Sequence, residues 1–297
     1  EGVACLEFHT KMNAMEPDIM DLIRQAINVV NTRFKALVVY NEGAAFSAGA
    51  NLALIQQLIS NESWESLGEV IKYGQSTYQQ LQQSSFPVVA APSGMALGGG
   101  CEVMLHCDVI QAHAETYAGL VEIGVGLIPG WGGCKEMLKR WNARTNVDKA
   151  TLKAFELMAT AKVSSSAAEA RDMGLLSEND QITMNRDRLL ADAKARALSM
   201  VENYQPKKDQ GIAQAGSAVK QKMLDLLQAF AEAGKATPHD VVVGSVLAEI
   251  LSGNDAGISS EEEIYQREQE GFSRLLTETA THARIDNMLK TGKPLRN

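Results

Sequence analysis

A stretch of apolar residues from Phe86 to Leu105 narrows the possible folds of this chain more than any other segment. Its length approaches the roughly 20 residues that a membrane-spanning helix needs. Two prolines and three consecutive glycines interrupt it, however, and these residues favour turns over a continuous helix. We therefore interpret it as a buried strand, Val88–Ala91, followed by a glycine-rich turn and a helix that begins near Cys101. No membrane span is expected.

The overall charge argues against nucleic acid as a partner. The 297 residues include 28 Lys and Arg against 36 Asp and Glu, a net charge of −8, and the sequence pI is about 5.3. Proteins that follow a phosphate backbone need a basic surface. The start of the chain has no signal-peptide pattern and no Met, which suggests a piece of a longer protein. Four cysteines without CxxC spacing predict reduced thiols, no metal site and a cytoplasmic location.

Short apolar runs alternate with amphipathic stretches over residues 1–178, which predicts an α/β catalytic core. The expected strands are Val3–Phe8, Ala36–Tyr40, Val88–Ala91 and Val109–Ala112, and the clearest expected helices are Ile19–Val30 and Leu67–Leu81. Residues 179–297 show helical periodicity without a convincing strand, so we expect a second, all-helical region there that covers the site or supports assembly. Its expected helices are Arg186–Met200, Ala218–Ala233, Val241–Leu251 and Glu261–Leu289.

Two glycine-rich turns each follow an expected strand and lead into a helix. One has small residues from Ser47 to Ala50, and the other contains Gly98, Gly99 and Gly100. Such turns expose backbone N–H groups, and two of them could supply the pair of donors that an oxyanion hole requires. The alternative is that these glycines only allow close packing.

Two glutamates follow the second turn and could form an acid–base pair. Glu102 lies in the first turn of the expected helix, where the helix dipole favours an ionised carboxylate. Glu122 lies among apolar residues, which favour a protonated carboxyl group. One charged and one neutral carboxyl group can move protons in opposite directions. Helix capping for Glu102 and a surface position for Glu122 are the alternatives.

Several separated motifs resemble the crotonase superfamily, and in particular its enoyl-CoA hydratases. They are FSAGAN at Phe46–Asn51, LGGGCE at Leu97–Glu102 and VEIGVGLIPGWGG at Val121–Gly133. The resemblance extends over about residues 2–177. It implies the crotonase (ClpP-like) fold, an α/β fold of repeated ββα units. The sequence departs from the family pattern at Asn51, where the family commonly has Asp, and at Val121, where the family frequently has Pro.

Carried onto this sequence, the resemblance implies syn addition of water to trans-2-enoyl-CoA, giving 3-hydroxyacyl-CoA in fatty-acid β-oxidation. The backbone N–H groups of Ala50 and Gly99 would hold the thioester oxygen, Glu102 would activate water and Glu122 would deliver the proton. Three further residues are expected to bind substrate, although Trp131 could instead fill the core: Ala48, Gly98 and Trp131. The alternatives are a Δ3,Δ2-enoyl-CoA isomerase of the same fold and a non-catalytic assembly fragment.

Cofactors and partners follow from the same comparison. No GxGxxG motif is present, so NAD is expected only in a dehydrogenase part that would precede this chain. The ending MLKTGKPLRN, Met288–Asn297, is similar to the C-terminus of bifunctional 3-hydroxyacyl-CoA dehydrogenase/enoyl-CoA hydratases. The resemblance also implies a homo-oligomer, a trimer or a dimer of trimers. A basic cluster is a candidate for the CoA phosphates, with a solvated helix face as the alternative: Lys135, Lys139 and Arg140.

Overall fold

The computed structural model describes residues 2–297, which divide into two compact units of three chain segments each. Unit 1 consists of the residues up to Asn51, Tyr73–Gly119 and Val163–Lys208. Unit 2 consists of Leu52–Lys72, Leu120–Lys162 and Asp209–Asn297. The division into regions 1–178 and 179–297, which rests on sequence periodicity, stays a prediction.

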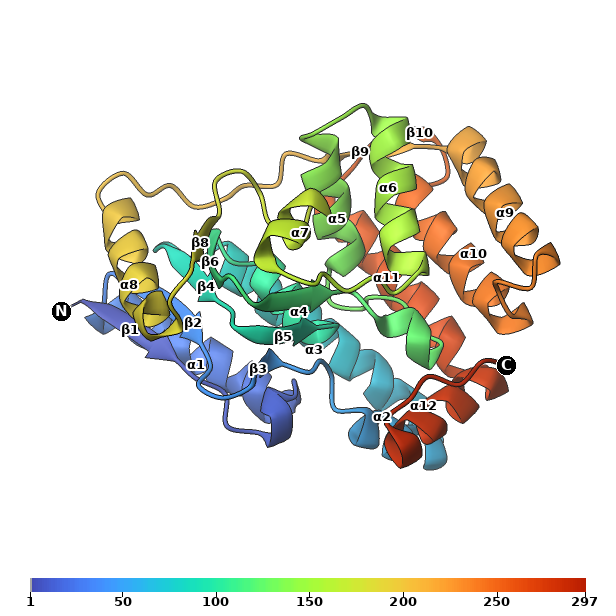
Figure 1. Cartoon of the computed structure of the whole chain (residues 1–297), viewed down its shortest axis with the longest axis horizontal. Helices are drawn as coiled ribbons and strands as arrows, with labels where there is room; N and C mark the ends of the chain where they lie inside the picture. The colour runs from blue at the N-terminus through green and yellow to red at the C-terminus, as the bar shows by residue number, and fades with distance from the viewer. Residues whose placement is uncertain (1) are drawn as a thin grey trace. The chain divides into compact units, whose positions relative to one another are not determined.

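A five-stranded parallel sheet with the order β1-β2-β4-β6-β8 forms the centre of unit 1 (Figure 1). Its strands are β1 (Val3–Leu6), β2 (Ala36–Tyr40), β4 (Val88–Ala91), β6 (Val109–His113) and β8 (Gln181–Thr183). Every residue of β2 and β4 is buried, which explains why both segments are continuous apolar runs rather than alternating ones. The bounds predicted for these two strands are confirmed.

A second, three-stranded parallel sheet with the order β3-β5-β7 also lies in unit 1. It contains β3 (Ala45–Ser47), β5 (Gly94–Leu97) and β7 (Thr116–Gly119). The chain gives one strand to each sheet in turn, as β2 then β3, β4 then β5, and β6 then β7. The pair β4 and β5 is followed directly by helix α4 (Gly99–Leu105). This repetition confirms the α/β fold of ββα units.

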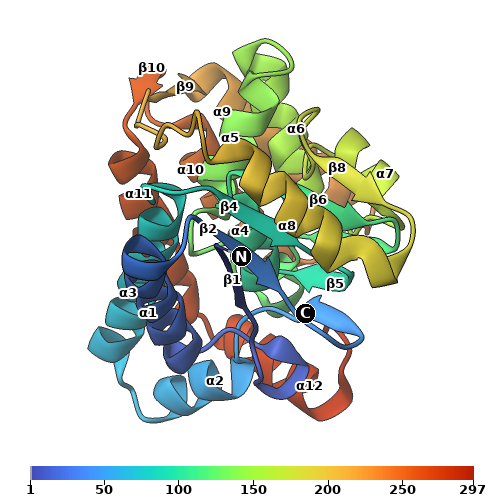
Figure 2. The same cartoon turned by 90° about the vertical axis from the view of Figure 1, so that its left-hand side faces the viewer.

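Helix α8 (Leu189–Met200) packs against strands β2, β4 and β6, as Figure 2 shows. Leu189, Ala193 and Ala197 recur every four residues, so they share one face of the helix, and all three are buried against the sheet. The remaining helical segments with residues in unit 1 are η1 (Lys11–Asn13), α1 (Pro17–Arg33), α3 (Trp64–Gln82), α7 (Ala167–Asp172) and η3 (Arg186–Arg188).

Unit 2 is mainly helical. Its elements are α2 (Leu52–Ser60), η2 (Glu122–Val125), α5 (Gly133–Asn142), α6 (Val147–Ala159), β9 (Ile212–Ala215), α9 (Ser217–Glu232), α10 (Pro238–Ser252), β10 (Ala256–Ser259), α11 (Glu261–Leu276) and α12 (Thr279–Thr291). Nine of the fifteen residues of helix α10 are buried, and the helix packs against α6, α9 and α11. Helix α11 begins with a capping box, in which Ser260 accepts from the Glu263 N–H and the Glu263 carboxylate accepts from Ser260.

The expectation that residues 179–297 contain no strand is wrong. Strand β8 joins the large sheet of unit 1, and β9 pairs antiparallel with β10 in unit 2. These strands have three or four residues, too few to show a period, and β10 has the sequence AGIS, which resembles a loop. The expected helix Glu261–Leu289 is also two helices, α11 and α12, separated at Thr277 and Glu278. Of the helices in residues 2–297, none combines the length and apolar character needed to cross a lipid bilayer.

Candidate active site

The two glycine-rich turns lie side by side in unit 1. Strands β3 and β5, which precede them, are parallel neighbours. Gly49 has a φ of +100°, and a Cβ atom there would lie 3.0 Å from the Leu97 carbonyl oxygen and 3.7 Å from the Gly99 nitrogen. Only glycine combines this backbone conformation with such a close approach. The sequence prediction that the turns could act together is therefore consistent with their positions.

Backbone hydrogen bonds hold the first turn on both sides of Ala50. The Met15 N–H donates to the Gly49 carbonyl at 2.8 Å, and the Asn51 N–H donates to the Met15 carbonyl at 2.9 Å. The Ala48 N–H donates to the Met12 carbonyl at 3.1 Å. The peptide that carries the Ala50 N–H is thus fixed by its neighbours.

The second turn is fixed by the neighbouring strands. The Gly98 N–H donates to the Gly119 carbonyl at 2.9 Å, and a Cβ atom on Gly100 would lie 2.4 Å from Cβ of Ser47. Gly99 is the first residue of α4, where a backbone N–H has no acceptor within its own helix. The glycines thus allow close packing, which is one of the two interpretations of the sequence. That the Gly99 N–H also acts as an oxyanion donor stays a prediction.

Tyr78 is a site residue that the sequence analysis missed. Its hydroxyl donates to the Gly99 carbonyl at 3.0 Å, and its side chain is completely buried. Burial, followed by the nearby carboxylate of Glu102, raises the pKa of Tyr78 well above its ordinary value, so the hydroxyl remains a donor. A tyrosine on an amphipathic helix gives no sequence signal for this contact.

Glu102 is buried, with 2% of its surface exposed, in the first turn of α4. Its N–H donates to the Gly98 carbonyl at 2.9 Å. His106, one turn later, is also buried, and its Nδ1 lies 2.7 Å from the backbone carbonyl of Glu102. The His106 ring lies 5.4 Å from the Tyr78 ring. Glu102 is therefore buried next to the second glycine-rich turn, in the same helix as Gly99.

Glu122 begins the short helix η2 in unit 2. Ile123 and Val125, on either side of Gly124, are buried, and both carboxylate oxygens of Glu122 are shielded from solvent. The Leu127 N–H donates to the Glu122 carbonyl at 3.1 Å, which closes the helix. The alternative interpretation, a carboxyl group on the surface, is therefore wrong, because both oxygens are shielded from solvent. The protonated state expected for Glu122 stays a prediction.

Trp131 lies in the loop before α5 in unit 2 and is 9% exposed. The neighbouring Gly130 packs on Phe272, since a Cβ atom there would lie 2.7 Å from Cδ2 of that ring. The Glu268 carboxylate accepts from the N–H groups of Gly132 at 2.7 Å and Lys135 at 3.0 Å. This loop is therefore tightly attached to α11.

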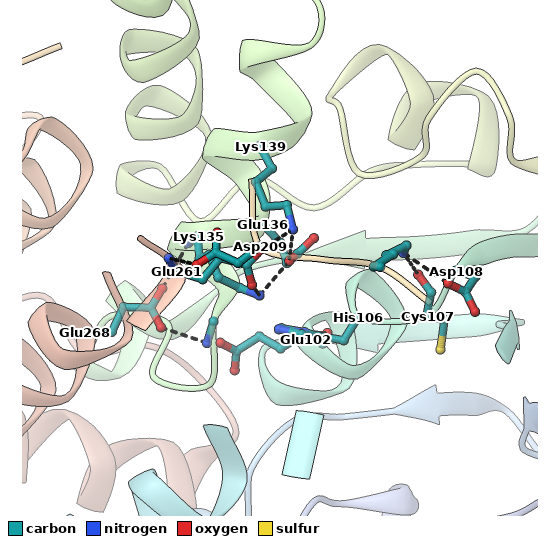
Figure 3. A network of polar contacts seen from close by, with 12 residues as sticks. Glu102, His106, Cys107, Asp108, Lys135, Glu136, Lys139, Asp209, Glu261 and Glu268 are labelled. Carbon is teal, nitrogen blue, oxygen red and sulfur yellow. Dashed lines mark hydrogen bonds and ion pairs between the residues drawn. The ribbon is translucent and has the colours of Figure 1, made fainter. Parts of the chain in front are cut away.

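The basic cluster of α5 does not form a solvated face. Lys135 is completely buried, and its Nζ lies 2.8 Å from Glu136 and 3.1 Å from Glu261. Lys139 Nζ lies 2.6 Å from Glu261, as Figure 3 shows. Although burial lowers the pKa of Lys135, the two glutamates raise it above its ordinary value. Lys135 is therefore enclosed in unit 2 and paired with carboxylates, which argues against its contact with a CoA phosphate. Phosphate binding by Lys139 and Arg140 stays a prediction.

Among residues 2–297, no three His, Cys, Asp or Glu side chains are grouped so that they could hold a metal ion.

Comparison with solved structures identifies the class of fold. An enoyl-CoA hydratase from Bacillus halodurans superimposes with a TM-score of 0.67 over 96% of each chain, at 18% identity. This chain therefore shares the fold of that enoyl-CoA hydratase. A sequence profile described as enoyl-CoA hydratase/isomerase matches residues 1–241, and the chain belongs to this family.

Two curated relatives from Bacillus subtilis are matched over only part of their own length. The chain is 40% identical to a probable 3-hydroxyacyl-CoA dehydrogenase of Bacillus subtilis, over 100% of this chain and 38% of that protein. It is 32% identical to a probable enoyl-CoA hydratase of the same organism, over 59% of this chain and 64% of that protein. The chain thus spans less than two thirds of the length of either relative.

Proposed function

We propose that this chain adds water, syn, across the double bond of trans-2-enoyl-CoA to give 3-hydroxyacyl-CoA, a step of fatty-acid β-oxidation. The observation that carries the proposal is the adjacency of the Gly49 and Gly99 turns, with the buried Glu102 in the same helix as Gly99. Membership of the enoyl-CoA hydratase/isomerase family supports a CoA thioester as substrate. The substrate then carries its own activating group, and the reaction needs no resident cofactor.

In the proposed mechanism, Glu102 accepts a proton from water while the water oxygen bonds to C3. The electrons of the double bond move toward the thioester oxygen, where the N–H groups of Ala50 and Gly99 stabilise the developing negative charge. Glu122 then gives a proton to C2, and the thioester carbonyl is restored. Ala48, Gly98 and Trp131 are proposed to contact the acyl-CoA.

Hydration can be tested directly by mixing the purified protein with a 2-enoyl-CoA and following the loss of conjugated absorbance. We expect Glu102→Gln and Glu122→Gln each to lower kcat by roughly 10²- to 10⁴-fold, the usual contribution of a positioned acid or base. Glu115→Gln, on an exposed residue of unit 1, is the matched control and should keep full activity. Circular dichroism would verify that all three variants fold.

The presence of two glutamates favours hydratase over Δ3,Δ2-isomerase chemistry, since an isomerase needs only one group to move a proton between carbons. Turnover of a 3-enoyl-CoA without hydration of a 2-enoyl-CoA would support the isomerase. A folded chain inactive on both substrates, but active within a longer protein, would support the assembly role.

The length of the B. subtilis dehydrogenase relative supports a wider proposal, that the full protein also carries an NAD-dependent dehydrogenase part. Such a part would oxidise the 3-hydroxyacyl-CoA formed here. Homo-oligomer formation remains a proposal from the resemblance, and sedimentation of the purified chain would test it.

A further inference from the structure

Helix α12 holds the segment that carries Glu122 through two backbone contacts. Arg284 is 2% exposed, and its Nη1 donates to the Ile123 carbonyl at 2.9 Å. Thr281, one turn earlier on the same face of α12, donates through Oγ1 to the Gly126 carbonyl at 2.9 Å. Both ends of η2 are therefore bonded to one helix that lies far away in the sequence.

The Arg284 guanidinium is itself fixed by three further partners in unit 2. Nη1 lies 2.8 Å from Oδ1 of Asp240, Nη2 donates to Oγ1 of Thr237 at 2.9 Å, and Nε donates to Oδ1 of Asn297 at 2.7 Å. Thr237 and Asp240 are held in turn by a capping box at the start of α10. A planar guanidinium has five N–H donors and can bond to all of these partners at once, whereas a lysine ammonium group has only three donors on one nitrogen and cannot.

The approach of α12 leaves η2 no room to move independently. Gly126 ends η2 with a φ of +79°, and a Cβ atom there would lie 2.8 Å from Oγ1 of Thr281 and 2.9 Å from Nε2 of His239. The side chains of Thr281 and His239 thus lie directly against the Gly126 backbone, because glycine has no side chain to keep them apart. A change in Arg284 would be transmitted to η2 rather than absorbed by flexible side chains.

We infer that Arg284 is a positioning residue, which orients the Glu122 carboxyl group by fixing the carbonyl of the adjacent Ile123. The inference rests on the proposed function, in which Glu122 delivers the proton to C2. Arg284 touches neither substrate nor reacting atoms in this proposal, and it acts through the direction in which η2 presents Glu122.

The test compares Arg284→Ala and Arg284→Lys with Arg274→Ala. Arg274 lies on α11 in an ion pair of 3.0 Å with Glu249, and its side chain is 54% exposed. We expect Arg284→Ala to lower kcat roughly 10- to 100-fold with little change in KM, the range found when residues that orient metal ligands are removed. Arg284→Lys should recover part of kcat, and Arg274→Ala should match the wild type.

Two readouts separate positioning from a purely structural role. Hydration in D₂O places one deuterium at C2, and NMR of the product reports on which face it arrives. We expect a lower stereochemical excess in Arg284→Ala, because a misdirected acid competes less well with protonation by solvent. Methylguanidinium added to Arg284→Ala should restore kcat and should have no effect on Arg274→Ala. If Arg284→Ala does not fold, the same NMR measurement is made on Arg284→Lys.

Glu122→Gln, measured in parallel, separates failure of this inference from failure of the proposed function. Wild-type hydration by Glu122→Gln would overturn the proposed function. Loss of hydration in Glu122→Gln, together with folded Arg284 variants whose kcat and stereochemistry match Arg274→Ala, would overturn only the positioning role.

Discussion

The hydroxyl group of Tyr78 donates a hydrogen bond of 3.0 Å to the carbonyl of Gly99, the residue proposed to present one oxyanion N–H. Tyr78 comes from α3 and Gly99 from the start of α4, so the bond joins two helices of unit 1 at the candidate site. The carbonyl and N–H of Gly99 belong to successive peptide planes. A contact on the carbonyl therefore restricts the rotation of the N–H.

Removal of this hydroxyl in Tyr78→Phe should lower kcat/KM about tenfold, which corresponds to about 1.4 kcal/mol. The reason is that the Gly99 peptide loses its constraint from α3 while the ring still fills the core. Tyr73→Phe is the control and should keep its activity, because Tyr73 is a partly exposed tyrosine of the same helix whose hydroxyl bonds to Asp21. Steady-state kinetics on a 2-enoyl-CoA would check both, and equal kinetics would contradict a role for the bond.

Gly49→Ala should lower kcat by roughly 10²- to 10³-fold, the cost of losing one oxyanion donor. The new Cβ atom would lie 3.0 Å from the Leu97 carbonyl and push the two turns apart. Gly43→Ala is a strict control, because Gly43 also has a positive φ, +119°, but a Cβ atom there would meet nothing within 4 Å. Both variants should lose stability of the order of 1–2 kcal/mol from backbone strain. A similar kcat in the two variants would argue against the oxyanion role of the turn.

Lys135→Met should destabilise the protein by about 3–5 kcal/mol, because it removes the fully buried cation between Glu136 and Glu261. Only the partly exposed Lys139 then remains to pair with these buried carboxylates. Lys153→Met removes a lysine from an exposed ion pair with Glu156 on α6 and should cost about 0–1 kcal/mol. Urea unfolding of the two variants gives the comparison. An equal decrease in the free energy of unfolding in both variants would mean that the buried ion pairs of Lys135 stabilise the protein no more than the exposed pair of Lys153 does.

The pH dependence of stability should depend on His239. Burial, followed by the charge of Arg284, lowers the pKa of His239 below its ordinary value of 6.5, although Glu278 and Asp240 oppose this. At a pH between the folded-state pKa and the ordinary value of 6.5, His239 is therefore mostly neutral in the folded protein and mostly protonated in the unfolded chain. The free energy of unfolding should therefore decrease as the pH falls below about 6.5, until the folded-state pKa is passed.

His239→Gln should reduce this loss of stability between pH 7 and pH 5, since glutamine does not titrate there. Unfolding midpoints of the wild type and of His239→Gln, measured across this pH range, would check the prediction. An unchanged pH dependence in His239→Gln would contradict the assignment.

The large sheet could be predicted from the sequence better than the small one. Ala36–Tyr40 and Val88–Ala91 are buried on both faces, and this burial is visible as uninterrupted apolar residues. Strands of the small sheet, such as Gly94–Leu97, are short and contain small residues, so their sequences resemble turns. Only their pairing with neighbouring strands identifies them as strands. The pairing of β9 with β10 depends on segments that are far apart in the sequence.

Parts of the candidate site also differ in how visible they are in the sequence. The two glycine-rich turns and the place of Glu102 in the first turn of α4 could be predicted, because each is a local pattern of small residues before a helix. Their proposed roles in catalysis stay predictions. The position of Arg284 could not be predicted, because its contact with Ile123 spans 161 residues and its burial among polar partners gives no periodic pattern. The burial of Lys135 could not be predicted either. A lysine on a helix is usually expected to face solvent, and only its ion pair with the distant Glu261 explains why it is buried.

The alternation of the chain between unit 1 and unit 2 limits how this protein can be cut or rearranged. Each unit draws on three separate segments, so no single cleavage releases either of them intact. A fragment that stops at residue 178 would lack β8 and α8 from unit 1 and everything after Asp209 from unit 2. Fragment complementation or circular permutation would therefore have to retain all three segments of both units. We expect an insertion between two segments to be better tolerated than the deletion of any one segment.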